Sequence, residues 1–79
     1  MRFSIDYIEY ELIIASDVIR DGLGIELWNK SENKMLAEIF RNDNKEKILF
    51  YSEKIEIPFE AIEKLIIGFN ERVGKDYQK

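Results

Sequence analysis

The fold is decided by residues 23–52, which read LGIELWNKSENKMLAEIFRNDNKEKILFYS. Apolar side chains recur at every second position in three runs, at about 23–29, 34–41 and 46–52, which is the period of a β-strand. The segments between these runs are rich in Asn, Asp and Ser, residues that favour turns. The stretch therefore predicts three consecutive antiparallel strands joined by hairpins.

A further strand is predicted upstream, at about residues 3–14, where β-branched and aromatic residues are frequent. The apolar phase of this segment slips by one position between Tyr7 and Ile8. A period of two cannot slip without turning the side chains to the other face of the sheet. We therefore expect a β-bulge or a bend near this point.

Residues 16–24 read as a structured loop between the first and second predicted strands. Ser16 or Asp17 is placed to cap one short helical turn, because short oxygen-bearing side chains accept hydrogen bonds from free backbone N–H groups. We expect Val18 and Ile19 to pack against the edge of the core.

A helix is predicted at residues 58–73. Pro58 suits its first position, where a missing backbone N–H costs nothing, and Gly74 is a typical C-terminal stop. Apolar residues recur at steps of three and four, which makes one apolar stripe. The stripe consists of Phe59, Ile62, Leu65, Ile66, Phe69 and Val73. Residues 75–79 form a polar tail that we expect to be mobile.

Together these elements predict one α+β domain spanning residues 1–79. It is a four-stranded antiparallel β-meander with one C-terminal α-helix packed across one face, in the order β-β-β-β-α. A chain of 79 residues has a thin core. A second copy, forming a homodimer, would bury surface that the monomer leaves in water.

The face of the sheet opposite the helix is predicted to be aromatic with an acidic border. If Ile25, Ile39 and Phe50 face the helix, period-two alternation sends a second apolar set to the other side. That set is Trp28, Leu36, Phe40, Leu49 and Tyr51, with one of Tyr7 and Tyr10, and with Glu26, Glu38 and, in one register, Glu9 among them. Such a patch is typical of an interface, although cross-strand aromatic pairs that stabilise the sheet are an equal alternative.

The composition argues against an enzyme. The chain has no Cys and no His, so thiolate metal sites, cysteine nucleophiles and the commonest general base are excluded. The pairs Asp17/Asp21 and Glu9/Glu11 do not match a calcium loop. Gly22-x-Gly24 opens a strand and is no phosphate loop. We expect no catalytic residue, no cofactor and no metal site.

Charge and the N-terminal segment narrow the choice of partner. The net charge is -4, and residues 1–29 hold six acidic against two basic residues. An acidic surface attracts basic proteins and repels nucleic acid and anionic membranes. Acidic residues interrupt every apolar run near the N-terminus, so no signal peptide is predicted. We expect a cytoplasmic protein that does not associate with membranes.

The first functional hypothesis is a small acidic protein-binding module, of the inhibitor or immunity type, that occludes a basic partner. Three carboxylates would steer that partner, and three aromatic side chains would anchor it. The steering residues are Asp17, Asp21 and Glu26, and the anchors are Trp28, Phe40 and Tyr51.

The alternative hypothesis is a homodimeric β-sheet protein that binds single-stranded nucleic acid. Basic residues occur near the two hairpin turns beside aromatic residues, which is the pattern of a stacking platform. They are Lys30, Lys34, Arg41, Lys45 and Lys47. The layout of four strands followed by a helix resembles that of the small dimeric transcriptional coactivators that bind single strands, a likeness of layout alone. Acidic neighbours such as Glu32 and Asp43 make nucleic acid the less favoured partner.

Overall fold

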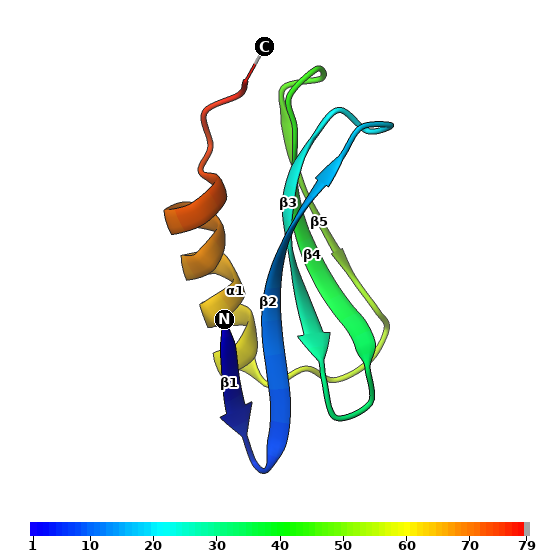
Figure 1. Cartoon of the computed structure of the whole chain (residues 1–79), viewed down its shortest axis with the longest axis vertical. Helices are drawn as coiled ribbons and strands as arrows, with labels where there is room; N and C mark the ends of the chain where they lie inside the picture. Colours follow the sequence, from blue (N-terminus) through cyan, green and yellow to red (C-terminus); the bar gives the residue numbers. More distant parts are fainter. Residues whose placement is uncertain (79) are drawn as a thin grey trace.

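The computed structural model describes residues 1–78 and shows a five-stranded antiparallel sheet with one helical segment against one face (Figure 1). The strands follow one another across the sheet in sequence order. They are β1 (Arg2–Ile5), β2 (Ile8–Asp17), β3 (Gly22–Asn29), β4 (Lys34–Asn42) and β5 (Lys47–Ser52). The predicted α+β meander with a C-terminal helix is therefore confirmed, whereas the predicted count of four strands is one too few.

The additional strand arises because residues 3–14 are a hairpin and not one bulged strand. Ile5 lies opposite Ile8, and Asp6 and Tyr7 between them have φ angles of 50° and 67°. Two consecutive residues with positive φ form the type of two-residue turn that suits the twist of a hairpin. The slip in apolar phase at Tyr7 and Ile8 thus marks a chain reversal, and the expected β-bulge or bend within one continuous strand is wrong. A register shift occurs instead in the β3–β4 ladder, at Leu27/Trp28.

The β2–β3 connection is shorter than the predicted loop, because β2 extends to Asp17 and β3 begins at Gly22. The Oδ1 atom of Asp17 accepts hydrogen bonds from the backbone N–H groups of Ile19 and Arg20, both at 3.0 Å. This bears out the capping role proposed for Asp17. Val18 and Ile19 are 93% and 96% exposed, so the expectation that they pack against the core is wrong. The tip that carries them projects past the end of the helix (Figure 1).

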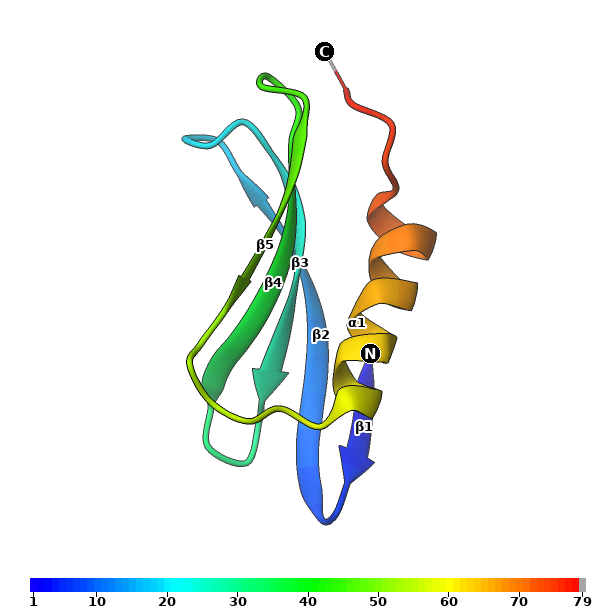
Figure 2. The ribbon, with the colours of Figure 1, turned by 180° about the vertical axis from the view of Figure 1, so that it is seen from behind.

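The helical segment consists of α1 (Phe59–Gly68), continued by a π-helical turn, η1 (Phe69–Val73). It packs across β2, β3 and β4 (Figure 2). Leu65 and Phe69 of the predicted stripe are buried, whereas Phe59 and Ile66 are 73% and 46% exposed, so the stripe faces the sheet only in part. Leu65 is completely buried, which is worth about 1.5–3 kcal/mol relative to exposure. The helix approaches β3 closely at Gly68, where an added Cβ would lie 2.9 Å from the Cδ1 of Ile25. The main core cluster comprises Tyr10, Leu12, Ile25, Leu27, Leu36, Ala37, Ile39, Ala61, Leu65 and Phe69.

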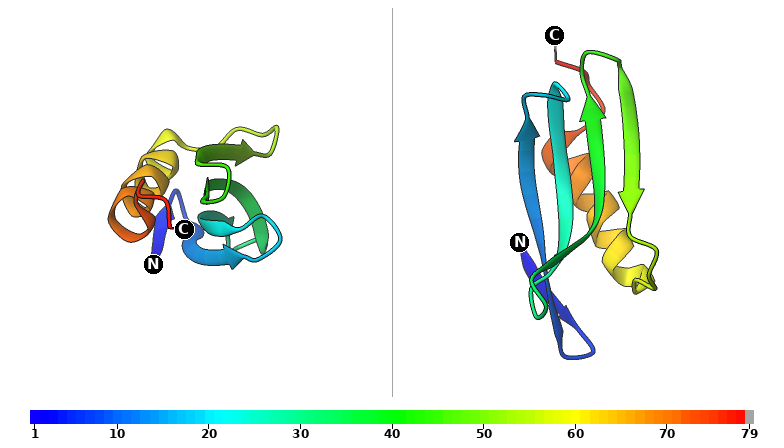
Figure 3. Two further views of the ribbon diagram at one scale, coloured as in Figure 1. Left: turned by 90° about the horizontal axis from the view of Figure 1, so that it is seen from above. Right: turned by 90° about the vertical axis from the view of Figure 1, so that its right-hand side faces the viewer.

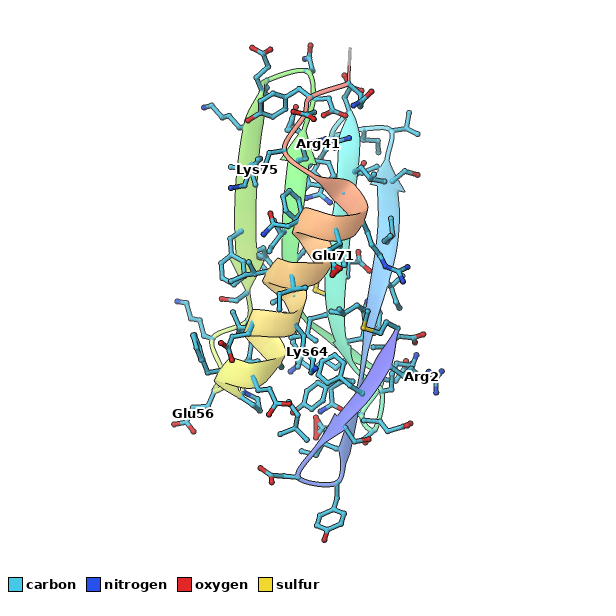
Figure 4. All side chains as sticks on the ribbon, turned by 90° about the vertical axis from the view of Figure 1, so that its left-hand side faces the viewer. Arg2, Arg41, Glu56, Lys64, Glu71 and Lys75 are labelled. Atoms are coloured by element: carbon cyan, nitrogen blue, oxygen red, sulfur yellow. The ribbon has the colours of Figure 1, made fainter. Side chains whose placement is uncertain are left out.

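A buried arginine fastens the end of the helical segment to the sheet. Arg41, on β4, donates hydrogen bonds from Nη1 to the carbonyl oxygens of Val73 at 2.7 Å and Gly74 at 3.2 Å. Its Nε donates to Asp43 Oδ1 at 2.7 Å. These contacts satisfy carbonyl groups that a helix leaves free at its C-terminus, and Figure 4 shows Arg41 at that end of the helix. The mobility of the tail 75–79 stays a prediction, and residue 79 lies outside the described residues.

Candidate functional site

The candidate site is the face of the sheet that the helix does not cover, called the open face below (Figure 3, right). Strand register places three of the expected polar and aromatic residues in a row across it. Glu38 on β4 lies between Glu26 on β3 and Tyr51 on β5. Phe40 and Leu49 form the adjacent pair. The alternation of β3, β4 and β5 therefore brings together the residue types that the sequence predicts for this face.

Arg20 covers the part of the open face around Phe40. Its guanidinium carbon lies 3.8 Å from the centre of the Phe40 ring. Its Nη1 and Nη2 donate to the two carboxylate oxygens of Glu38 at 3.1 and 3.0 Å, and its Nε donates to Asp17. Phe40 is only 1% exposed, so it cannot serve as the exposed anchor predicted for it. Leu36 is also buried and belongs to the core cluster, not to the exposed patch.

Two glycines on β3 explain how the Phe40 ring lies flat on the sheet. A Cβ at Gly22 would be 2.7 Å from the Cζ of Phe40, and a Cβ at Gly24 would be 3.0 Å from its Cδ1. The ring therefore occupies the space that side chains on β3 would take. This agrees with the interpretation that these glycines permit the close approach of a neighbouring chain segment.

The ion network around Arg20 fixes the charges on this part of the face. Hydrogen bonds from the backbone and side chain of Arg20 hold the pKa of Asp17 below its ordinary value, against a smaller opposing effect of desolvation. Hydrogen bonds to Glu38 and Asp17 raise the pKa of Arg20. A carboxylate with a lowered pKa stays ionised well below neutral pH, so Asp17 remains paired with Arg20 throughout the neutral range.

Trp28 and Glu26 form the acidic and aromatic part of the open face nearest the β3–β4 turn. The indole Nε1 of Trp28 donates to Glu26 Oε1 at 2.9 Å, and both side chains are half-buried. The Nζ of Lys30 lies 5.6 Å from the centre of the Trp28 ring. The hydrogen bond holds the Glu26 carboxylate beside an aromatic surface, which suits it to contact a cationic group.

The exposed apolar residues of the open face lie on β5. Leu49 and Tyr51 are each 49% exposed. The Tyr51 hydroxyl donates to Glu53 Oε1 at 3.1 Å, and this hydrogen bond raises the pKa of Tyr51. Of the three predicted aromatic anchors, Tyr51 is exposed, Trp28 is half-buried and Phe40 is covered.

The remaining steering residue, Asp21, lies apart from Trp28 and Glu26. Asp21 precedes β3 in the tip, with φ of 57°, whereas Trp28 lies near the other end of that strand. Its carbonyl oxygen accepts a hydrogen bond of 2.9 Å from the backbone N–H of Asp43. The structure thus divides the predicted steering residues between the tip and the middle of the sheet.

The basic residues considered for nucleic-acid binding do not converge. Lys30 and Lys34 lie at the β3–β4 turn, and Lys45 and Lys47 lie at the β4–β5 turn, at the opposite end of β4. A strand of nine residues spans roughly 30 Å. Arg41 is buried and engaged with Asp43. Sequence proximity to turns suggested one cluster, but the intervening strand separates it into two.

Sequence reasoning missed the role of Arg20, and its partner Glu38 lies 18 positions away. The only available signal was its place beside Asp17 and Asp21 in a polar tip. Among residues 1–78, no group of three or more potential ligands is arranged to hold a metal ion. Neither α1 nor any other described helix has the length and apolar character needed to cross a membrane. Comparison with protein-family models, curated proteins and solved structures finds no match to this chain.

Proposed function

We propose that this chain is a protein-binding module of the inhibitor type, whose open face occludes a basic surface of another protein. The observation that carries the proposal is the row across the open face in which Glu26, held beside the Trp28 ring, and exposed Tyr51 flank Glu38, whose carboxylate Arg20 already occupies. Exposed Leu49 adds apolar area beside the row. Apolar anchors next to oriented carboxylates are typical of surfaces that bind cationic partners.

Arg20 indicates which partner chemistry fits this face. Its guanidinium stacks on an aromatic ring and binds a carboxylate through two hydrogen bonds. Glu26, fixed beside the Trp28 ring, offers a second carboxylate–aromatic pair to a cation from outside. A partner arginine is therefore the preferred ligand group, because its planar fork matches both carboxylate and ring.

The test begins with capture of partners from an extract of the native host and identification by mass spectrometry. The captured protein is then purified and titrated by calorimetry against variants of the open face. Trp28→Ala and Glu26→Gln are each expected to weaken binding about tenfold or more, as anchor residues do. Affinity should also fall as salt is raised, because the steering charges are screened.

Ile67→Ala is the matched control, since Ile67 is an exposed apolar residue on the helix. Its affinity should equal that of the unchanged protein. Unaltered affinity in a variant that carries Trp28→Ala, Glu26→Gln and Tyr51→Ala together would reject the open face as the binding surface. Salt-dependent binding of a single-stranded oligonucleotide, with no basic protein captured, would favour the nucleic-acid alternative.

A further inference from the structure

β5 lies at an open edge of the sheet, and its side chains are apolar on both faces of the strand. It is the last strand of the sheet and pairs only with β4 among the described residues. Ile48, Leu49, Phe50 and Tyr51 are 36%, 49%, 57% and 49% exposed. No charged residue interrupts these four positions. Edge strands of monomers are normally protected by charge, a bulge or a covering element, because an unprotected edge pairs with another chain.

The helix side of β5 continues as an apolar groove. The groove has a volume of about 310 Å3. Its lining residues are Ile39, Ile48, Leu49, Phe50, Ile62 and Ile66. It forms because α1 packs on β2, β3 and β4 and leaves β5 beside it, as Figure 4 shows.

The backbone of β5 shows which residues can pair across the open edge. The N–H of Glu53 donates to the Leu36 carbonyl oxygen at 2.9 Å, which continues the β4–β5 register by one pair. Backbone groups alternate in direction along a strand, so those of Tyr51 point towards β4 as well. The N–H and C=O groups of Phe50 therefore point away from β4, into the open edge.

We propose that a second copy of this chain occupies this edge, with the two β5 strands antiparallel and Phe50 opposite the partner's Phe50. The two five-stranded sheets then form one continuous sheet, with both helices on the same side. This self-complementary arrangement places Phe50 on the two-fold axis, where its outward N–H and C=O bond to the partner's Phe50.

Charge complementarity selects this register over its neighbours. With Phe50 at the centre, Lys47 lies opposite the partner's Glu53, and symmetry repeats the pair. With Leu49 at the centre, Lys47 would face the partner's Tyr51. With Tyr51 at the centre, Glu53 would face the partner's Leu49. The Phe50 register alone pairs these opposite charges, and cross-strand pairs of opposite charge favour a register.

Sedimentation velocity of the purified protein from about 1 μM to about 1 mM tests the proposal over the useful range of affinities. The unchanged protein is expected to form a reversible dimer. Phe50→Lys places two like charges on the axis and is expected to be monomeric throughout. Ile19→Lys also replaces an exposed apolar side chain by lysine, but in the tip and not on β5, so this variant should dimerise normally.

Charge reversal tests the register without removing apolar surface. Lys47→Glu should weaken dimerisation about tenfold at low salt, because both symmetric pairs become repulsive. Adding Glu53→Lys to the same chain should restore the affinity to within about threefold. Failure of the double variant to recover would refute the Phe50 register. Circular dichroism identifies any variant that does not fold, and the charge swap then still decides the question.

A protein that stays monomeric over the whole range would overturn the inference, as would a Phe50→Lys variant that dimerises normally. Binding of an extended synthetic peptide by a monomeric protein would assign the edge to a different occupant. The measurement uses this protein alone. Its result is therefore independent of whether the open face binds a basic partner.

Discussion

Replacing Arg20 by methionine is expected to destabilise the fold because Arg20 neutralises a nearly buried carboxylate. The Glu38 side chain is 7% exposed, whereas that of Arg20 is 44% exposed. Breaking a fully buried ion pair costs about 3–5 kcal/mol, and breaking an exposed pair costs about 0–1 kcal/mol. Water reaches Glu38 once the guanidinium is gone, so we expect an intermediate loss of about 2 kcal/mol. Methionine keeps an apolar chain over Phe40, which isolates the electrostatic part.

The measurement is urea unfolding followed by the fluorescence of Trp28, the only tryptophan in the chain. The same loss can be measured by thermal unfolding, where about 2 kcal/mol lowers the midpoint temperature of a domain of this size by roughly 8–16 °C. Glu38→Gln removes the carboxylate charge, and the double variant completes a thermodynamic cycle. We expect Arg20 and Glu38 to be coupled by about 1–2 kcal/mol.

Arg72→Met is the matched control, because Arg72 is exposed at the end of the helical segment. Its effect should stay within about 0.5 kcal/mol, as for an ordinary surface position. A coupling energy below about 0.5 kcal/mol between Arg20 and Glu38 would show that the pair behaves as an exposed ion pair. The stabilising role inferred from the buried carboxylate would then be wrong.

Three further predictions concern Gly22 on β3, Gly74 after the helical segment, and Asp17 in the tip. Gly22→Ala should cost about 1–3 kcal/mol in denaturant unfolding, because the new Cβ would lie 2.0 Å from the Arg41 carbonyl oxygen and a strand must move. Gly74→Ala, where nothing lies within 4 Å but φ is 79° and ψ is 171°, should cost about 1–3 kcal/mol from the backbone conformation alone, because that conformation is essentially confined to glycine. Hydrogen bonds from Arg20 are the main cause of the lowered pKa of Asp17 in the folded state. The stability that this carboxylate contributes is therefore fully present above its ordinary pKa of 3.8. It is lost as the pH falls through the lower pKa of the folded state. Thermal unfolding at decreasing pH should therefore show a smaller loss in Asp17→Asn than in the unchanged protein, and equal losses would contradict this origin.

The regular parts of the fold were predictable because they depend on local periodicity. The period-two runs at 23–29, 34–41 and 46–52 predicted β3, β4 and β5, and the apolar stripe predicted the helical segment. The β1–β2 hairpin was missed because its turn, Asp6–Tyr7, contains no glycine or asparagine. Tyr7 adopts positive φ against the ordinary preference of an aromatic residue.

The composition of the open face was only partly predictable, because covering groups come from distant positions. Alternation alone predicts that Phe40 lies on the other face of the sheet from Ile39, which faces the helix. The strand register confirms that placement. Its burial depends on Arg20, 20 positions earlier, and on two glycines that no periodicity distinguishes from turn residues. Similarly, the sequence predicts that Arg41 is a surface cation beside a turn. Arg41 is instead buried, because Val73, 32 residues later in the chain, lies against it.

The two proposed surfaces are geometrically compatible, and this has a consequence for binding strength. A two-fold axis normal to the sheet leaves both open faces on the same side of the dimer. With Phe50 at the centre, Leu49 lies opposite the partner's Tyr51 on that side, so the two apolar strips become continuous. If both proposals hold, a partner immobilised on a surface is bound through two copies at once, and Phe50→Lys weakens that avidity strongly. The same variant leaves binding to a single soluble partner unchanged, because Phe50 lies on the helix side and does not touch the open face.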